Sequence, residues 1–267
     1  MNTYKSVLSM LFLAACSPAV FAASNDELAK KLANPIANLI SVPFQNNIDY
    51  GGGKNGNGFR YTLNVQPVIP FSISDDWNLI SRTIMPVIHQ DNYVYDDGWS
   101  QTGLGDVVQS LFFSPKAPTE GGMTWGVGPV FLLPTASEDY LGTEKWGAGA
   151  TAVALIQQGK WTYGALVNHL TDVAGSRYRS DLNATFLQPF MTYSLGGGRT
   201  LSANFEATYD WENKQWSAPM NLAWNKVTQW GKQTVQYGVG LRYWLDSPAG
   251  AADGFGARFN LILLFPK

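Results

Sequence analysis

Polar and apolar residues alternate along most of this chain, from Phe44 to Phe265, in segments of roughly ten residues. The last segment shows the alternation most clearly, with one face made of Phe255, Ala257, Phe259, Leu261, Leu263 and Phe265. Its other face carries Gly256, Arg258 and Asn260. A period of two residues predicts a β-strand. Because one face is apolar while the other keeps charged residues, the pattern predicts a membrane-spanning β-barrel with a wet interior.

Twelve segments follow this pattern, at residues 42–50, 58–70, 77–89, 105–114, 123–134, 146–157, 161–170, 182–194, 200–211, 216–228, 233–245 and 255–265. Tight turns are predicted at 74–76, 158–160, 196–199 and 230–232, and between them lie connections at 51–57, 90–104, 135–145, 171–181, 212–215 and 246–254. All of these connections except 212–215 are clearly longer than the tight turns. Short turns alternating with long loops are typical of outer-membrane barrels, whose short turns face the periplasm. The sequence therefore predicts an all-β fold, a transmembrane antiparallel β-barrel of about 12 strands, with both termini on the periplasmic side.

Tryptophans gather at the ends of the predicted strands. Near the short turns lie Trp77, Trp161 and Trp230, and near the longer connections lie Trp99, Trp146, Trp211, Trp216 and Trp244. Two such belts are typical of the two membrane interfaces, where an aromatic ring buries its body and wets its polar tip. The alternative is the aromatic core of a soluble barrel, but a position beside a hairpin turn is a poor place for a core side chain. We therefore predict interface aromatics at Trp77, Trp161, Trp216, Trp230 and Trp244.

Composition agrees with an apolar surface made by strands. Only 14% of the 267 residues are charged, whereas soluble domains carry about 25%. No segment beyond the N-terminal region reaches the roughly 18 apolar residues that a membrane-spanning helix needs. The net charge of -2 and the lack of a basic run argue against a nucleic-acid partner.

The N-terminus reads as an export signal followed by a helix. Residues 1–22 are predicted to be a signal peptide, 23–41 a periplasmic N-terminal helical segment, and 42–267 the outer-membrane β-barrel. The alternative for the signal is lipidation, because Cys16 ends a lipobox-like run; as the single cysteine it leaves no intramolecular disulfide. Ser24 and Glu27 predict a helix start, and Pro35 is expected to divide the helix into two. The segment is either a plug at the barrel mouth or a periplasmic tail that packs locally.

Several short stretches resemble one family. They are residues 32–37 (LANPIA), 66–70 (QPVIP), 77–83 (WNLISRT), 103–106 (GLGD), 110–115 (SLFFSP), 142–146 (GTEKW) and 264–267 (LFPK). Nearly the whole mature chain resembles a bacterial outer-membrane family usually labelled as transporters and related to the group named after the meta-pathway of phenol degradation; some members carry the mistaken name neuromedin U. The resemblance implies an outer-membrane barrel and brings no established substrate and no catalytic residues. One departure from the wider barrel class is that Pro266 and Lys267 follow the terminal aromatic Phe265.

Charged residues on the polar faces are the candidates for chemistry in the lumen. The predicted lumen-lining residues are Arg60, Arg82, Glu206, Asp210, Arg242 and Arg258. Three arginines come from the second, eleventh and twelfth strands, and both carboxylates come from the ninth. One hypothesis is a transverse field across a narrow pore, with cations on one wall and carboxylates on the other. The alternative is a set of salt bridges that fills the lumen, and a barrel of twelve strands is of a size that allows either.

A lipid hydrolase is a remote alternative, because it needs a serine and an oriented histidine within hydrogen-bond reach. The chain has only His89 and His169, and no motif ties a serine to either. The acidic loop 90–104 lacks the spacing of a calcium loop. We therefore expect no catalytic residue, no metal site and no cofactor.

The leading functional prediction is passive or facilitated passage of small solutes, with hydrophobic or aromatic compounds among the candidates. The alternative is a structural or envelope-interaction barrel with a filled lumen. The expected partners are outer-membrane lipid and lipopolysaccharide, the barrel-assembly machinery and an unidentified small solute, and we expect a monomer.

Overall fold

A computed structural model of the protein describes residues 24–95 and 98–266. The predicted signal peptide and Cys16 lie outside the described residues, so the choice between cleavage and lipidation stays a prediction. Among the described residues, no helix is both long and apolar enough to span a membrane.

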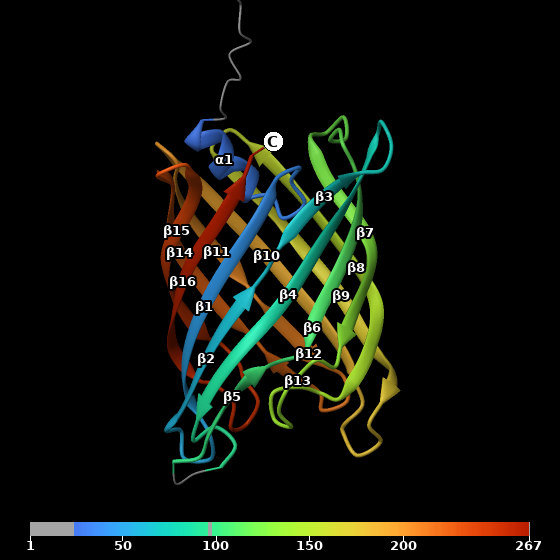
Figure 1. The fold of residues 1–267 in the computed structure, drawn as a ribbon, viewed down its shortest axis with the longest axis vertical. Helices are drawn as coiled ribbons and strands as arrows, with labels where there is room; N and C mark the ends of the chain where they lie inside the picture. Colours follow the sequence, from blue (N-terminus) through green and yellow to red (C-terminus); the bar gives the residue numbers. More distant parts are fainter. Residues whose placement is uncertain (1–23, 96–97, 267) are drawn as a thin grey trace, which may run out of the picture.

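The described residues form one short helix and one antiparallel sheet of sixteen strand segments (Figure 1). The elements are α1 (Asn25–Leu32), β1 (Ile40–Gly52), β2 (Gly58–Val65), β3 (Val68–Ser72), β4 (Trp77–Asp91), β5 (Ser100–Leu104), β6 (Val107–Pro115), β7 (Met123–Leu133), β8 (Lys145–Gln158), β9 (Trp161–Gly175), β10 (Asn183–Gly196), β11 (Arg199–Phe205), β12 (Ala207–Asp210), β13 (Gln215–Ser217), β14 (Pro219–Trp230), β15 (Gln233–Trp244) and β16 (Gly254–Phe265). The sheet closes on itself because β1 pairs with β16, from Ile40 opposite Phe265 to Ile48 opposite Ala257.

Four of the twelve strands of the barrel are interrupted, which gives sixteen segments, and one of these segments, β5, lies outside the strand predicted at 105–114. The interrupted pairs are β2 and β3, β5 and β6, β11 and β12, and β13 and β14. The first break falls at Gln66 and Pro67, and proline has no N–H to give to the ladder. With each pair counted once, the described part of the chain is a closed antiparallel barrel of twelve strands, so the predicted fold class is confirmed. Two boundaries differ by more than a few residues: β5 and the end of β4 lie in the region 90–104, where the sequence predicts a longer loop, and β9 continues to Gly175 within the predicted connection 171–181.

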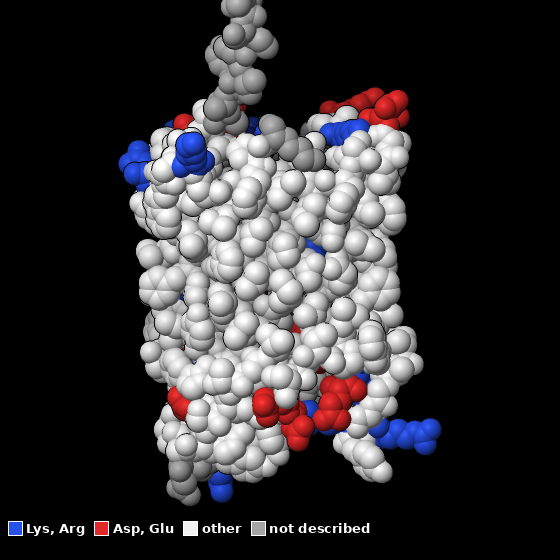
Figure 2. Space-filling model, in the orientation of Figure 1, with Lys and Arg blue, Asp and Glu red and all other residues white. Residues whose placement is uncertain are grey.

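The two ends of the barrel differ in the way the sequence predicts. In Figure 1, α1, the C-terminus and the short turn between β3 and β4 lie at the top, and the longer connections lie at the bottom. Figure 2 shows charged side chains at both ends of the visible face and a broad band of other residues between them. Outward side chains in this band include Leu187, Leu241 and Phe259, of which Leu241 is 62% exposed. An apolar band of this extent is stable against lipid and not against water.

Four of the five tryptophans predicted at the membrane interfaces lie on the outer surface of the barrel. Trp77, Trp161 and Trp230 are exposed on the outer surface near the short turns, and Trp216 is exposed near the opposite end. The prediction for Trp244 is wrong, because its ring faces the interior, where Nε1 donates a hydrogen bond of 2.8 Å to Asp49 Oδ1. The reason is the alternation of β15, in which even-numbered positions point inward.

The N-terminal segment contains one helix and not two. Ser24 caps α1 through a capping box, since its hydroxyl accepts from the Glu27 N–H and the Glu27 carboxylate accepts from the Ser24 N–H. After Leu32 the chain turns, and the Asn34 side chain accepts a hydrogen bond of 2.9 Å from the Ile36 N–H. Proline at position 35, together with this local bond, leaves no second helix before β1 begins at Ile40.

Candidate channel lumen

A cluster of charged side chains crosses the interior of the barrel, centred on Glu206. This residue lies at the break between β11 and β12, and its carboxylate accepts two hydrogen bonds from Arg258, at 2.8 and 2.7 Å. Arg242 Nη1 donates a third at 2.9 Å, and Arg242 Nε donates to Asp49 Oδ1 at 2.8 Å. The neutral partners complete the set, because Asn47 accepts from Arg258 and Asn221 accepts from Arg242. We call Asn47, Asp49, Glu206, Asn221, Arg242 and Arg258 the Glu206 cluster.

The Glu206 cluster is nearly shielded from water. The side chain of Arg258 is 4% exposed and that of Glu206 is 17% exposed. Charges removed from water in this way are held only when each finds a partner, and here every guanidinium and carboxylate does. The cluster therefore links β1, β14, β15 and β16 to the break between β11 and β12 through the lumen.

The geometry differs from the opposed walls that the sequence suggested. Glu206 does not face the arginines across an open lumen, because it binds Arg242 and Arg258 directly. Asp210 is not in the cluster. It ends β12 near the long loops, where its carboxylate accepts from the N–H groups of Glu212 and Asn213 and from the Asn213 amide. The ninth predicted strand thus supplies one carboxylate to the lumen cluster and one to a turn.

Sequence reasoning missed Asp49, although the signal for it was present. Polar side chains on β1 alternate through Gln45, Asn47 and Asp49, and this is the pattern that identified the other lumen residues. Since β1 closes against β16, Asp49 and Asn47 come within reach of Arg242 and Arg258.

Arg60 lies beyond the Glu206 cluster, toward the long loops. Its guanidinium donates two hydrogen bonds to Gln90 Oε1, at 3.0 and 2.6 Å, and lies 3.8 Å from the centre of the Tyr93 ring. Tyr93 belongs to a long loop that folds back over this end, where its hydroxyl accepts a bond from the Ala252 N–H. Burial raises the pKa of the Tyr93 phenol above its usual value, so the ring meets Arg60 as a neutral group. No sequence pattern places this loop residue.

Arg82 lies on the other side of the cluster, beside a central cavity of about 360 Å³. Its Nη2 donates to Gln66 Oε1 at 3.1 Å. Among the residues that the structure describes, no carboxylate lies within salt-bridge distance of Arg82. Arg82 is therefore a cation that lines the cavity with a neutral hydrogen-bond partner, and Glu206, which lines the same cavity, is the carboxylate that it senses at longer range.

The wall of this central cavity is amphipathic. Its polar part comes from strands around the barrel, including β1, β4, β6, β9 and β10, and comprises Gln45, Asn64, Gln66, Arg82, Ser110, Asn168, Gln188, Glu206 and Thr208. Its apolar part comprises Ile84, Val108, Leu132, Leu170, Leu182, Ala184 and Phe186. The cavity suits a small molecule that has both an apolar body and a polar or charged group.

The N-terminal segment, residues 24–39, closes the end of the barrel opposite the long loops. Leu28 and Leu39 pack with Val227 and Leu264, and Ile36 packs with a separate cluster that includes Phe112. A smaller cavity of about 160 Å³ lies between this segment and the barrel wall, and Gln66 and Arg82 line both cavities. The central cavity thus lies between the N-terminal segment and the Glu206 cluster.

Polar bonds fasten the same segment to one turn of the barrel and to the end of β8. Asp26 Oδ1 accepts a bond of 2.6 Å from the Gly198 N–H, and Gln157 Nε2 donates to the Lys30 carbonyl at 2.8 Å. Together with the apolar contacts, these bonds give the geometry of a plug and not that of a tail packed on itself. The prediction had left both open.

The two histidines lie away from the lumen. His169 Nδ1 is 2.9 Å from the Thr185 hydroxyl, and His89 lies between the Thr102 hydroxyl, at 2.6 Å, and Asp91, at 3.1 Å. Among the described residues, no serine hydroxyl is hydrogen-bonded to either ring.

Comparisons with known proteins agree on the fold. No family model matches the chain, and comparison with curated proteins found no significant match. An outer membrane channel from Pseudomonas putida F1 is similar in structure, with a TM-score of 0.65 and 14% identity over 85% of this chain and 94% of that chain. Outer membrane phospholipase A from Escherichia coli has a TM-score of 0.46 and 12% identity over 91% of this chain and 99% of that chain. The beta domain of the Bordetella autotransporter Brka has a TM-score of 0.47 and 12% identity over 86% and 99%.

At these identities the likeness extends to the fold alone, and the two scores below 0.5 support nothing further. The resemblance to the transporter family stays a prediction, supported only in that a structural neighbour is an outer membrane channel, and the name neuromedin U finds no support. The closed strands, the apolar outer band and the similar fold of the Pseudomonas putida channel together show that the chain is an outer-membrane β-barrel.

Proposed function

We propose that this barrel lets small solutes cross the outer membrane through its lumen, and that it favours anions with an apolar part. The observation that supports this most directly is the central cavity, which has an apolar wall and carries Arg82 without a carboxylate partner. The solute itself stays open.

The lumen carries an excess of positive charge. Four arginines line its middle part, Arg60, Arg82, Arg242 and Arg258, against the two carboxylates of Asp49 and Glu206 (4 − 2 = +2). A narrow passage with low-dielectric walls raises the local concentration of ions of opposite sign. We therefore expect anions to pass more readily than cations.

In this proposal the N-terminal segment is a gate. The contacts of Leu28 and Ile36 hold it across the mouth, and a solute passes when those contacts open. The Glu206 cluster narrows the route on the other side of the cavity. The second candidate function, a structural barrel with a filled lumen, is favoured by this cluster and would require that the segment never opens.

Conductance in planar bilayers separates the two candidates. The purified full chain is compared with Ile36→Ala and Leu28→Ala, which weaken the plug, and with Val127→Ala, a matched change on the lipid-facing surface. We expect brief openings for the full chain and more frequent openings for the two plug variants. Inserted barrels that stay silent in all four proteins would refute passage and favour the structural role.

We also propose that the barrel is not a hydrolase. His169 is hydrogen-bonded to a threonine hydroxyl and, among the described residues, to no carboxylate, whereas His89 lies between the Thr102 hydroxyl and Asp91 and is therefore the arrangement that an assay must test. Release of fatty acid from phosphatidylglycerol micelles by purified protein, abolished by His89→Ala or His169→Ala, would overturn this.

A further inference from the structure

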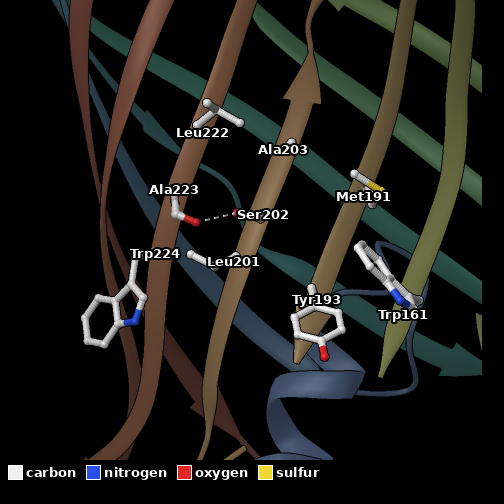
Figure 3. Close-up of a pocket in the computed structure, with 9 residues that line it drawn as sticks. All are labelled: Trp161, Met191, Tyr193, Leu201, Ser202, Ala203, Leu222, Ala223 and Trp224. Atoms are coloured by element: carbon white, nitrogen blue, oxygen red, sulfur yellow. Dashed lines mark hydrogen bonds between the residues drawn. The ribbon is translucent and has the colours of Figure 1, made fainter. Parts of the chain in front are cut away.

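An apolar groove lies on the outer surface of the barrel, away from the lumen. It has a volume of about 630 Å³ and runs over β10, β11 and β14 (Figure 3). Met191 and Tyr193 border it on one side and Leu222 and Trp224 on the other, with Leu201 and Ala203 between them. The small side chain of Ala203 stands between Met191 and Leu222, which are its neighbours on the adjoining strands. This gap in a row of large side chains makes the groove.

Two basic side chains lie at the end of the groove nearest the short turns. Arg199 opens β11 two residues before Leu201, and Lys226 follows Trp224 by two residues on β14, so both share the outward face of the groove. They are direct cross-strand partners. Side chains in that relation have Cβ atoms about 5 Å apart, and like charges placed so repel each other.

The structure gives this pair no counter-charge. Among the described residues, no carboxylate lies within salt-bridge distance of Arg199 or Lys226. Arg199 Nε donates to the Gly196 carbonyl at 3.0 Å, which leaves its outer nitrogens directed away from that bond. A bound anion between the two side chains would relieve their repulsion.

The depth of the pair is that of lipid headgroups. On β15, Tyr237 is the cross-strand partner of Lys226, and its ring lies 6.1 Å from Trp224 and 6.2 Å from Trp230, all part of the aromatic belt near the short turns. Aromatic belts of this kind mark the level at which headgroups begin. The short turns face the periplasm, so the pair meets the phospholipid leaflet and not lipopolysaccharide.

We propose that this surface binds an anionic phospholipid of the periplasmic leaflet. The lipid phosphate lies between Arg199 and Lys226, and one acyl chain fills the groove over Ala203. Arginine and lysine suit this role because both donate hydrogen bonds to phosphate oxygens. The apolar walls of the groove lie next to these charges, on the side toward the membrane centre. The site is independent of passage through the lumen.

Lipid retention in a nonionic detergent tests the site. The purified full-length barrel is mixed with dioleoyl phosphatidylglycerol or dioleoyl phosphatidylethanolamine, and bound lipid is counted by native mass spectrometry. We expect preferential retention of phosphatidylglycerol. Each basic residue near the surface contributes about fivefold in affinity, so the double variant R199Q/K226Q should weaken retention on the order of 30-fold.

Two further variants make the test specific. Lys232→Gln removes a lysine from the neighbouring turn and should leave retention unchanged. Ala203→Leu fills the groove, keeps both charges, and should weaken binding of the full lipid but not of glycerophosphoglycerol, which has no acyl chains. Heat-modifiable migration on gels shows that each variant is folded.

Three results would overturn the proposal. The first is equal retention of the two lipids by the unaltered barrel. The second is an equal loss with Lys232→Gln, which would mean diffuse attraction to the rim. The third is binding of glycerophosphoglycerol as tightly as the full lipid, which would mean that the groove holds no chain.

Discussion

Replacing Glu206 with glutamine is the sharpest test of the interior geometry. Glu206→Gln keeps the size and shape of the side chain but removes the charge that joins Arg242 to Arg258. Arg242 keeps Asp49 as its carboxylate partner, whereas Arg258 keeps only the neutral Asn47 amide. The substitution therefore removes the carboxylate partner mainly from Arg258, whose side chain is 4% exposed.

The size of the effect follows from the bonds that change. Hydrogen bonds to charged groups contribute about 1.5 to 3 kcal/mol each, and the Glu206 carboxylate makes three. Removing one partner of a buried ion pair costs about 3 to 5 kcal/mol. Since Glu206 is 17% exposed to the lumen, we expect a loss near the lower end, about 3 kcal/mol of unfolding free energy. The lumen excess rises from +2 to +3 at the same time.

Two measurements on one preparation check this prediction. Urea unfolding in liposomes gives the stability, and the reversal potential in a KCl gradient gives the ion selectivity, which should move further toward chloride. Asp210→Asn is the matched control, because Asp210 came from the same sequence pattern but binds only Glu212 and Asn213. We expect that control to lose about 1 kcal/mol or less and to keep the selectivity.

The reasoning fails on either of two results. If the two variants lose the same free energy, Glu206 does not hold the arginines together. If Glu206→Gln shifts selectivity toward potassium, the charges that line the route have been assigned wrongly.

Three other predictions concern the plug, the cavity and the barrel wall. Ile36→Ala should lower the unfolding free energy by about 2 to 4 kcal/mol, because Ile36 is buried, and should raise the opening frequency in bilayers; a stable and still silent variant would exclude a plug. Arg82→Gln should reduce chloride selectivity with little loss of stability, since its partner is the neutral Gln66, and an unchanged reversal potential would remove Arg82 from the route. Gly149→Ala should lower the unfolding free energy measured in urea by about 1 to 3 kcal/mol, because an added Cβ would overlap the His169 carbonyl oxygen. The control is Gly126→Ala, whose added Cβ meets only contacts of 3.3 Å or more. Equal stabilities of the two variants would mean that the barrel wall shifts to accommodate the methyl group at Gly149.

Much of the fold follows from the period of two. The alternation in segments such as Phe255 to Phe265 is enough to define strands, and the unequal turn lengths predict which end faces the periplasm. Trp77, Trp161 and Trp230 could be assigned to a belt because a ring beside a hairpin turn has few other places to go. These features are local, so neighbouring residues in the chain determine them.

The contacts inside the lumen join residues that are far apart in the sequence. Period two puts Trp244 on the same face as Arg242, but its partner Asp49 lies on β1, which only closure of the barrel brings within reach. The sequence likewise assigned the same predicted role to Glu206 and Asp210 because they lie on one strand, whereas in the structure Glu206 forms ion pairs with Arg242 and Arg258.

By itself, then, the sequence determined that this chain is a membrane barrel with a polar interior, because alternation and turn length act within single hairpins. The tertiary structure alone decided that the arginines meet Glu206 and Asp49, that the N-terminal segment closes one mouth, and that a cavity remains between them. The physical reason is closure of the sheet. Which residues of distant strands lie at the same level along the barrel axis depends on the stagger of the whole barrel. Every strand pair contributes to that stagger, and no single segment encodes it.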